Sequence, residues 1–443
     1  MTFKAQLVRL DEIALINPKR RVTKGTSVPF VEMAALPQNF RDINPSEVET
    51  RIAKGAGAHF QNGDTLLARI TPCLENGKTA QVDCLEDDSV GEGSTEFIVL
   101  CGIDREDDDY VYYLCRDAEF REYAIGRMEG TSGRQRVSWQ SIAAYEFAFP
   151  PPSQRKAAAQ ILTELDDRIS LLRETNATLE AIAQALFKSW FVDFDPVRAK
   201  SDGKLPEGID QATAALFPDA FEESELGLVP RGWRVTAVGD VVNVTDYVAN
   251  GSFAALKDNV TLLDSPSYAL YVRTTDYNSG FSGGYRYVDK SAYDFLSKSA
   301  LNGDEVIISN VGDVGTVFRP PSWLEIPMTL GSNAVALKKP DMSAYLYFHF
   351  SGRLGQHDIQ SIVTGSAQLK FNKTNFRALR LLIPDAKCLA HFESIANLML
   401  SRIAINLSQI QGLTSIRDTL LPRLISGQLR IADAEAELEK ATA

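Results

Sequence analysis

Two short runs of the sequence, residues 129–139 and 363–373, combine glycines with side chains that donate hydrogen bonds or carry positive charge. Arg, Lys, Asn and Gln bind base edges in the major groove of DNA, and Ser and Thr also hold phosphates. Glycine lets such a loop approach another backbone closely. These runs therefore predict contact with a nucleic acid. The candidate contact residues are Thr131, Ser132, Arg134, Gln135, Arg136 and Ser138 in the first run, and Ser366, Gln368, Lys370, Asn372 and Lys373 in the second.

A polar loop with arginine is common on protein surfaces, so neither run alone is specific. Here the combination occurs twice, each time just before a long helical segment, in a chain whose formal net charge is −12. The charge is spread unevenly: residues 201–226 carry −6, residues 345–380 carry +4 and residues 127–140 carry +2. The overall charge argues against a protein that coats nucleic acid indiscriminately, and the local basic runs are compatible with a selective DNA reader.

The sequence shows no catalytic constellation. Residues 77–79 resemble the end of a P-loop, but Pro72 stands where the first glycine is required. Residues 91–93 begin a GxGxxG pattern, but Glu96 stands at the last glycine position. The histidines form no HExxH and no metal-spaced pair with cysteine, and the acids at 107–109 precede a predicted helix, where they serve as cap and dipole partners. We therefore expect a non-catalytic chain.

Length and composition are those of a globular protein. The 443 residues predict roughly two to four domains. No apolar run approaches the roughly 20 residues that a membrane span needs, and the N-terminus lacks a secretory apolar core. The five cysteines contain no CxxC, which indicates reduced thiols rather than a disulfide framework or a zinc site. We expect a cytoplasmic protein.

The longest predicted element is a helix within residues 150–196, bounded by prolines at both ends. Its apolar positions alternate in steps of three and four, as in a heptad seam. At 1.5 Å per residue the helix would be about 60 Å long and would need a partner of equal length. The seam positions are Leu162, Leu165, Ile169, Leu172, Asn176, Leu179, Ala183, Leu186 and Trp190.

An internal repeat supplies that partner. Three blocks, at residues 28–36, 60–82 and 135–150, match residues 268–277, 300–320 and 368–384 in the same order. The last block leads into a second long helix at about residues 385–426, with Pro422 expected to kink its end. Each half therefore reads as a module of short strands and helices followed by one long helix. We expect an α+β fold: two similar globular domains separated by an antiparallel coiled coil of two long helices.

Two asparagines, Asn176 and Asn406, stand at seam positions of the predicted helices. A buried seam Asn costs stability but fixes register, and a wet edge position is the equally weighted alternative. Antiparallel pairing would hold the two modules at opposite ends of a rod. The expected divisions are module 1 at 1–150, helix 1 at 151–196, a linker at 197–231, module 2 at 232–384, helix 2 at 385–427 and a C-terminal tail at 428–443, whose short charged end at 434–443 we expect to be frayed.

Four phrases of the sequence together resemble type I restriction-modification specificity (S) subunits. They are residues 150–197, which cover the first long helix, GDTLLARITPCLENGKTA at 63–80, SELGLVPRGWRV at 224–235 and LLPRLISGQLRI at 420–431. The resemblance spans essentially the whole chain. It adds Arg69 and Lys78, which lie in the second phrase, to the candidate DNA contacts. The matching block of the second half, residues 310–315, has no such Arg/Lys pair, so we expect the halves to differ there.

The resemblance implies a function that fits the residues. Each of two target-recognition domains would read one half of a bipartite site in double-stranded DNA. The coiled coil would set the spacer and dock two modification (methyltransferase) subunits, and restriction (motor-nuclease) subunits would complete the complex. S-adenosylmethionine, ATP and magnesium would be used by those partners, with no cofactor bound by this chain. The alternative is a coiled-coil scaffold with two protein-binding heads and no direct DNA contact.

Three aromatic residues at the end of the first long helix, Trp190, Phe191 and Phe194, carry a further expectation. Clustered aromatic side chains are typical of protein interfaces. We therefore consider them candidates for docking another subunit, with packing against the second helix as the equally weighted alternative.

Overall fold

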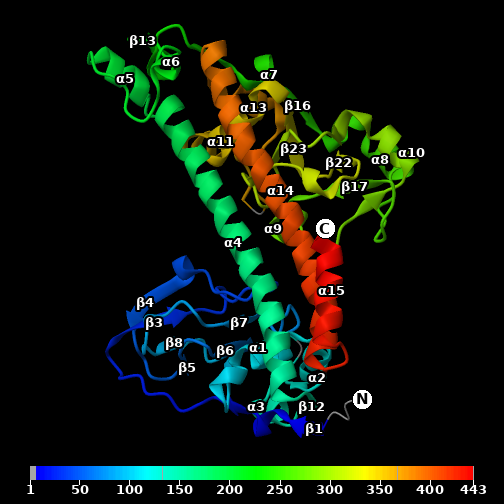
Figure 1. Cartoon of the computed structure of the whole chain (residues 1–443). Helices are drawn as coiled ribbons and strands as arrows, with labels where there is room; N and C mark the ends of the chain where they lie inside the picture. Colours follow the sequence, from blue (N-terminus) through cyan, green and yellow to red (C-terminus); the bar gives the residue numbers. More distant parts are fainter. Residues whose placement is uncertain (1–5, 132, 367, 443) are drawn as a thin grey trace. The chain divides into compact units, whose positions relative to one another are not determined.

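The computed structural model describes residues 6–131, 133–366 and 368–442. The chain forms two units, one of residues 1–172 and 410–443 and the other of residues 173–409. The divisions fall inside two long helices, α4 (Pro152–Phe191) and α14 (Ala386–Ile425), drawn in green and orange in Figure 1. Each unit therefore contains one globular module and a segment of each long helix.

In the described part of the first unit, the module is built on two four-stranded sheets, ordered β2-β9-β6-β7 and β4-β3-β8-β5. The strands β3 and β8 are parallel, and the other pairs in these sheets are antiparallel. The strands are β2 (Ala14–Ile16), β3 (Ser27–Val31), β4 (Val48–Ile52), β5 (Ala58–Phe60), β6 (Thr65–Ala68), β7 (Thr79–Gln81), β8 (Gly91–Gly93) and β9 (Phe97–Gly102). After β9 come α1 (Asp108–Arg116), α2 (Ala118–Ile125) and α3 (Trp139–Ala143).

The described part of the second unit repeats this plan with sheets ordered β16-β23-β20-β21 and β18-β17-β22-β19. Its strands follow the chain in the same sequence, and β17 and β22 again form the parallel pair. They are β16 (Asn243–Asp246), β17 (Ala269–Val272), β18 (Tyr287–Val288), β19 (Ala300–Leu301), β20 (Val306–Ser309), β21 (Val317–Phe318), β22 (Met328–Leu330) and β23 (Ala334–Lys338). The helices α11 (Ser343–Ser351), α12 (Arg353–Ser361) and α13 (Lys373–Ala378) occupy the places of α1, α2 and α3.

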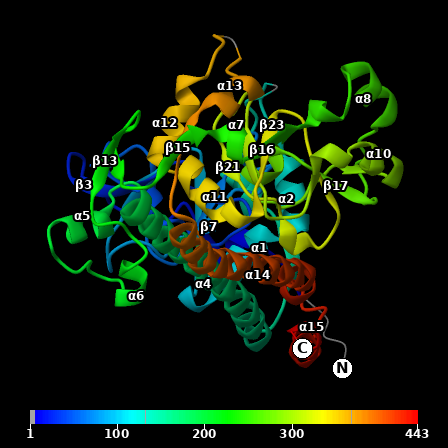
Figure 2. The ribbon, with the colours of Figure 1, turned by 90° about the horizontal axis from the view of Figure 1, so that it is seen from above.

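Short antiparallel pairs join the two ends of each module. In the first unit β1 (Gln6–Arg9) pairs with β12 (Glu146–Phe149), and in the second β15 (Arg234–Ala237) pairs with β24 (Arg380–Ile383). Further helices of the second module are α7 (Val238–Val241), α8 (Phe253–Asn259), α9 (Thr274–Asn278) and α10 (Lys290–Phe295). The helices α8 and α10 lie near β17 (Figure 2). The predicted α+β fold and the internal repeat are confirmed.

The long helices pair antiparallel within each unit, because the start of one packs against the end of the other. In the first unit Leu162 and Leu165 of α4 share a core with Leu420 and Leu424 of α14. In the second unit the core joins the end of α4, including Ala183 and Phe187, to the start of α14, including Phe392 and Ala396. Most positions of the seam predicted for α4 are therefore buried, and Asn176, Leu179 and Leu186 are half-buried.

The seam asparagines bond to each other. Asn406 is fully buried, and its Nδ2 donates to Oδ1 of Asn176 at 2.7 Å, both residues lying in the second unit. In the first unit the polar seam contact is an ion pair between Asp166 and Arg417, whose side chains are each 3% exposed. Of the two alternatives for the asparagines, the buried seam position holds for Asn406, whereas Asn176 is half-buried.

Two sequence expectations are wrong. The segment expected as a lightly packed linker contains α5 (Asp195–Ser201), α6 (Gln211–Ala214) and a hairpin of β13 (Phe221–Ser224) and β14 (Gly227–Pro230). Its Val197, Phe217 and Val229 are buried in the core of the second unit. The tail expected to be frayed forms α15 (Ile431–Thr442), because Ala434 packs into the core of the first unit. Both segments are acidic, but a few apolar side chains in each are spaced so that they pack into a core, and the segments are therefore ordered.

Candidate nucleic-acid interface

The first glycine-marked run forms a β-hairpin. Strand β10 (Met128–Glu129) pairs antiparallel with β11 (Arg136–Val137), so Glu129 lies opposite Arg136. Gly130 has a φ of 129°, and a Cβ at this position would lie 2.9 Å from the carbonyl oxygen of Arg134. The amide of Arg134 donates to the carbonyl of Thr131 at 2.9 Å and closes the turn. Ser132, also a predicted contact, lies outside the described residues.

The second run forms the corresponding turn in the second unit. Thr364 and Lys370 exchange backbone hydrogen bonds of 2.8 and 2.9 Å. Gly365 has a φ of 99°, and a Cβ there would lie 2.4 Å from the carbonyl oxygen of Gln368. Each hairpin therefore needs glycine at the same place for the same steric reason.

Both hairpins attach to their modules through matching backbone hydrogen bonds. In the first unit the amide of Val137 donates to the Arg69 carbonyl and the amide of Thr71 donates to the Gln135 carbonyl, both at 3.0 Å. In the second unit the Phe371 amide donates to the Asn310 carbonyl at 3.1 Å, and the Gly312 amide donates to the Leu369 carbonyl at 3.0 Å. Superposed by this pattern, Arg69 corresponds to Asn310, Arg136 to Lys370 and Ser138 to Asn372.

Several predicted contact residues are exposed at the hairpin tips. They are Thr131, Arg134, Ser366, Gln368 and Lys370, and Gln135 is half-buried. In the described residues, no side-chain hydrogen bond or ion pair involves the side chains of Arg134, Gln368 or Lys370. These side chains are available to an outside partner.

Two predicted contacts cap helices instead. The Ser138 hydroxyl accepts from the Ser141 amide at 3.0 Å at the start of α3, and the Asn372 side chain accepts from the Asn375 amide at 2.7 Å at the start of α13. Such caps typically contribute about 1 kcal/mol to stability. Both side chains therefore serve the fold.

Two predicted cations are already paired inside their modules. Arg136 forms a bidentate pair with Glu96, with Nε and Nη2 at 2.7 to 2.9 Å from its oxygens, and hydrogen bonding to Glu96 raises the pKa of Arg136. Lys373 Nζ lies 2.9 Å from Asp246 Oδ1. Arg136 remains 41% exposed, so its pair with Glu96 lies at the surface beside the hairpin.

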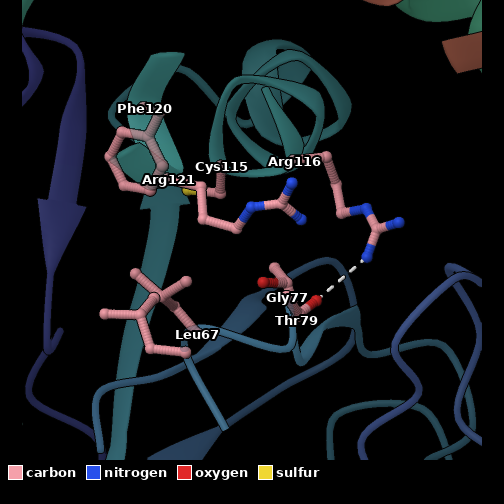
Figure 3. Close-up of a pocket in the computed structure, with 8 residues that line it drawn as sticks. Leu67, Gly77, Thr79, Cys115, Arg116, Phe120 and Arg121 are labelled. Carbon is pink, nitrogen blue, oxygen red and sulfur yellow. Dashed lines mark hydrogen bonds between the residues drawn. The ribbon is translucent and has the colours of Figure 1, made fainter. Parts of the chain in front are cut away.

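Lys78 holds a loop in place. Its Nζ donates to the carbonyls of Met33 and Ala34 at 2.8 and 3.2 Å. Beside it, Arg116 donates to the carbonyls of Gln38 and Gly77, the second of which is drawn as a dashed line in Figure 3. Lys78 and Arg116 together therefore hold the segment 33–38, a role of Lys78 that the sequence did not indicate.

Arg69 differs from these residues. Its side chain lines a cavity, and its buried Nε has no hydrogen-bond partner among the described atoms. The same cavity is lined by Lys19 and Arg20, which belong to a cationic cluster, Lys19, Arg20, Arg21 and Lys24, that the sequence interpretation missed. The signal was present, since four cations within six residues are unusual in so acidic a chain.

The aromatic cluster at the end of α4 is mostly internal. Trp190 and Phe191 are 2% and 4% exposed and pack edge-on against Phe217 and Phe392 respectively. Their side chains offer no docking surface, and the packing alternative is the one that the structure shows. Phe194 is half-buried, with a φ of 57°.

The described residues contain no group of three or more His, Cys, Asp and Glu side chains that could hold a metal ion. Within the same residues, no helix combines the length and the apolarity needed to cross a bilayer.

The sequence of this chain is similar to those of known specificity subunits. No protein-family model matches the chain. The chain is 27% identical over 428 residues to the type I restriction enzyme HindI specificity subunit of Haemophilus influenzae, covering 84% of this chain and 87% of that protein. It is 23% identical over 333 residues to the MjaIX specificity subunit of Methanocaldococcus jannaschii, covering 73% and 70%.

A solved structure has a similar fold. The crystal structure of a type I restriction-modification S subunit from M. genitalium matches with a TM-score of 0.50 and 14% identity over 96% of each chain. The resemblance predicted from the sequence is confirmed by these relatives.

Proposed function

We propose that this chain, a relative of type I specificity subunits over 84% of its length, is the DNA sequence-specificity subunit of a type I restriction-modification complex. The observation that carries the proposal is the pair of equivalent hairpins, one in each unit, with Arg134 and Arg136 in the first and Gln368 and Lys370 in the second. Each module, at residues 1–150 and 232–384, would read one half of a bipartite target. The chain itself would carry out no catalysis.

The hairpin suits the groove it would enter. The major groove of B-DNA admits a two-stranded β-ribbon, and Arg, Lys and Gln recognise base edges there. The exposed tip residues can reach outward, while backbone hydrogen bonds to residues 69–71 and 310–312 hold the base of each hairpin. This arrangement supports direct readout by the tips.

The paired long helices would set the unread spacer and dock two modification subunits. Support comes from the outward face of α14, where Leu398 and Ile405 are 74% and 51% exposed one heptad apart. Half-buried Phe194, which lies between α4 and α5, remains a candidate at the edge of such a surface. Restriction subunits would then join in the cytoplasm, and S-adenosylmethionine, ATP and magnesium would be used by the partner subunits.

The test is to map methylated sites in cells that carry this chain with its modification subunit. The expected result is one motif of two specified parts separated by a spacer of fixed length. Changing Arg134 and Arg136 to Ala should then relax one part, and changing Gln368 and Lys370 to Ala should relax the other. Stable complexes with no sequence preference would instead support the scaffold alternative, in which both heads bind proteins.

A matched pair of variants separates recognition from folding. Lys370→Ala removes an unpaired exposed cation, whereas Lys257→Ala removes an exposed lysine of α8 in the same unit. Only the first should weaken binding to the preferred duplex in a gel shift, and both should keep the melting temperature. Equal binding by the two variants would contradict a role for the second hairpin.

A further inference from the structure

A cavity of about 310 Å³ lies beside the hairpin of the first unit. Its walls include Lys19, Arg20, His59 and Arg69, with Gly57 and Thr95 between them. Such a set of cationic and hydrogen-bonding side chains suits an anion rather than an apolar ligand.

Arg69 is the central observation at this cavity. Its guanidinium donates no hydrogen bond to any described atom, and its Nε is buried. An unmet arginine donor is costly unless an acceptor arrives from outside. Through its backbone, Arg69 is joined to the hairpin at Val137 and to the adjacent Glu96 by hydrogen bonds of 3.0 Å. A residue that lines the cavity is therefore hydrogen-bonded directly to the hairpin.

The segment that carries the other cations is firmly anchored. The Asn17 amide donates to the Val99 carbonyl at 2.7 Å, and its side chain accepts from the Val99 amide at 3.0 Å. Arg20 forms an ion pair with the fully buried Asp64. At the other end the Gly25 amide donates to the Ala53 carbonyl at 3.1 Å. Lys19, Arg21 and Lys24 are thus held on a fixed loop.

The nearby carboxylates do not neutralise these cations. Asp64 is shared by Arg20 and Arg105, and Glu92 accepts from the amides of Lys54 and Gly55 while lying 3.8 Å from His59. Glu96 is engaged by Arg136. Lys19, Arg21 and Lys24 are exposed and form no ion pair with any described residue. An excess positive charge remains at this edge of the first module.

The second module lacks this feature. Asn310 stands in place of Arg69, and residues 247–256, which follow β16, contain no cation, whereas residues 17–26, which follow β2, contain Lys19, Arg20, Arg21 and Lys24. The repeated framework therefore carries the cavity cations in one copy only.

We propose that the cavity at Arg69 and the loop cations Lys19, Arg21 and Lys24 form a binding site for DNA backbone phosphates that serves the first half-site alone. Arg69 would hold a phosphate in the cavity, and the loop would follow the adjoining backbone. Contacts of this kind fix register and add affinity without reading sequence. The inference rests on the proposed function. It predicts that binding to the first half-site depends more strongly on salt concentration than binding to the second.

The experiment measures the affinity of the complex of this chain and its modification subunit for its methylated-site duplex from about 50 to 200 mM salt. Removing one phosphate contact should make the slope of log K against log salt shallower by about 0.9. Lys19→Gln with Arg21→Gln should therefore reduce the slope by up to roughly 1.8, and Arg69→Gln by about 0.9. The preferred sequence should not change. Lys257→Gln with Lys298→Gln, at exposed lysines of the second unit outside its hairpin and outside the long helices, is the charge-matched control and should leave the slope unaltered.

The outcomes are distinguishable. A wild-type complex with no preferred sequence would refute the proposed function itself. A preferred sequence with an unchanged slope in the Lys19/Arg21 and Arg69 variants would overturn the phosphate site alone. If inorganic phosphate at constant ionic strength raised the melting temperature of the wild-type complex but not of Arg69→Gln, while the DNA slope stayed the same, the cavity would be a small-anion site and the DNA assignment would be wrong.

Discussion

The buried ion pair of the first unit gives the sharpest test of how the long helices are held together. Arg417 Nη1 of α14 lies 2.6 Å from Asp166 Oδ1 of α4 and 3.1 Å from the Asn39 carbonyl. The Tyr113 hydroxyl donates to the other oxygen of Asp166 at 2.8 Å. Arg417 also contacts Asp418, which is 58% exposed. The perturbation is to replace Arg417 with Met.

The expected cost follows from what remains after the change. Arg417→Met leaves the Asp166 carboxylate buried with the Tyr113 hydroxyl as its described partner, and an uncompensated buried charge costs about 3–5 kcal/mol. Asp166→Asn keeps a polar group at this position, and Arg417 retains its contacts with Asp418 and the Asn39 carbonyl. The free energy of unfolding should therefore fall by only about 1–3 kcal/mol. The double change of Asp166 to Leu and Arg417 to Met removes both charges and should cost less than Arg417→Met, because a well-packed apolar pair often replaces a buried ion pair without a penalty.

Hydrogen exchange measured by mass spectrometry resolves the two units in one experiment. Peptides from α1 report the first unit and peptides from β23 report the second, so a local drop in stability is separated from a global one. The reasoning fails if Arg417→Met destabilises the first unit no more than the double variant, or if the second unit loses as much protection as the first.

Three further perturbations address the second unit. Asn176→Leu leaves the buried amide of Asn406 without its partner and should lower the free energy of unfolding by about 1–3 kcal/mol, as measured in a urea titration. Changing both residues to Leu should restore that free energy. If the double variant is as unstable as Asn176→Leu, the two asparagines do not act as a pair on the helix seam. Burial lowers the pKa of His349 from 6.5 to about 4. Between these two pH values the unfolded chain binds a proton that the folded unit does not. The free energy of unfolding should therefore be highest above pH 6.5 and fall by about 3 kcal/mol as the pH drops to 4. His349→Phe should flatten that dependence in thermal melts at several pH values, and His357→Gln, at an 83% exposed side chain, should not. Gly365→Ala should distort the second hairpin at a cost of about 1–3 kcal/mol in free energy and weaken binding to one half-site. Gly412→Ala, where no atom lies near the added Cβ, should bind DNA as the wild type does in a gel shift.

Periodicity and repetition allowed much of the fold to be predicted. The steps of three and four at Leu162, Leu165 and Ile169 depend only on helix geometry, and the structure buries all three. The repeat predicted that both modules share one order of elements, because matching blocks in matching order fold by matching contacts. The linker was misread because its acids dominate the composition, while burial of Val197 and Phe217 depends on partners distant in the sequence.

The candidate site was predicted less completely. Residue type identified Arg136 and Lys373 as cations, but their pairing with Glu96 and Asp246 arises from strands and loops that meet only in the fold. Ser138 and Asn372 have side chains equally suited to a phosphate and to a helix cap, and the start of a helix directly after each decides between these roles. Arg69 was chosen from its sequence context, and only the cavity distinguishes it from Lys78.

The two hairpins show why one framework could read two different sequences. Their attachment uses backbone groups: Arg69 and Asn310 donate their amides to the carbonyls of Glu96 and Asn333 at 3.0 Å in each unit. In the second unit the Asn310 side chain adds a hydrogen bond of 3.4 Å from Nδ2 to the Phe371 carbonyl. The shared backbone bonds let the side chains differ between the units while the framework stays the same. At the corresponding place one unit carries Arg136 fixed by Glu96, and the other carries an unpaired Lys370. Because Glu96 engages Nε and Nη2 of Arg136, this guanidinium is held in one orientation with Nη1 turned toward the Arg134 carbonyl. Lys370 is instead a mobile point charge. On the proposed function, the first hairpin should discriminate bases more strictly than the second.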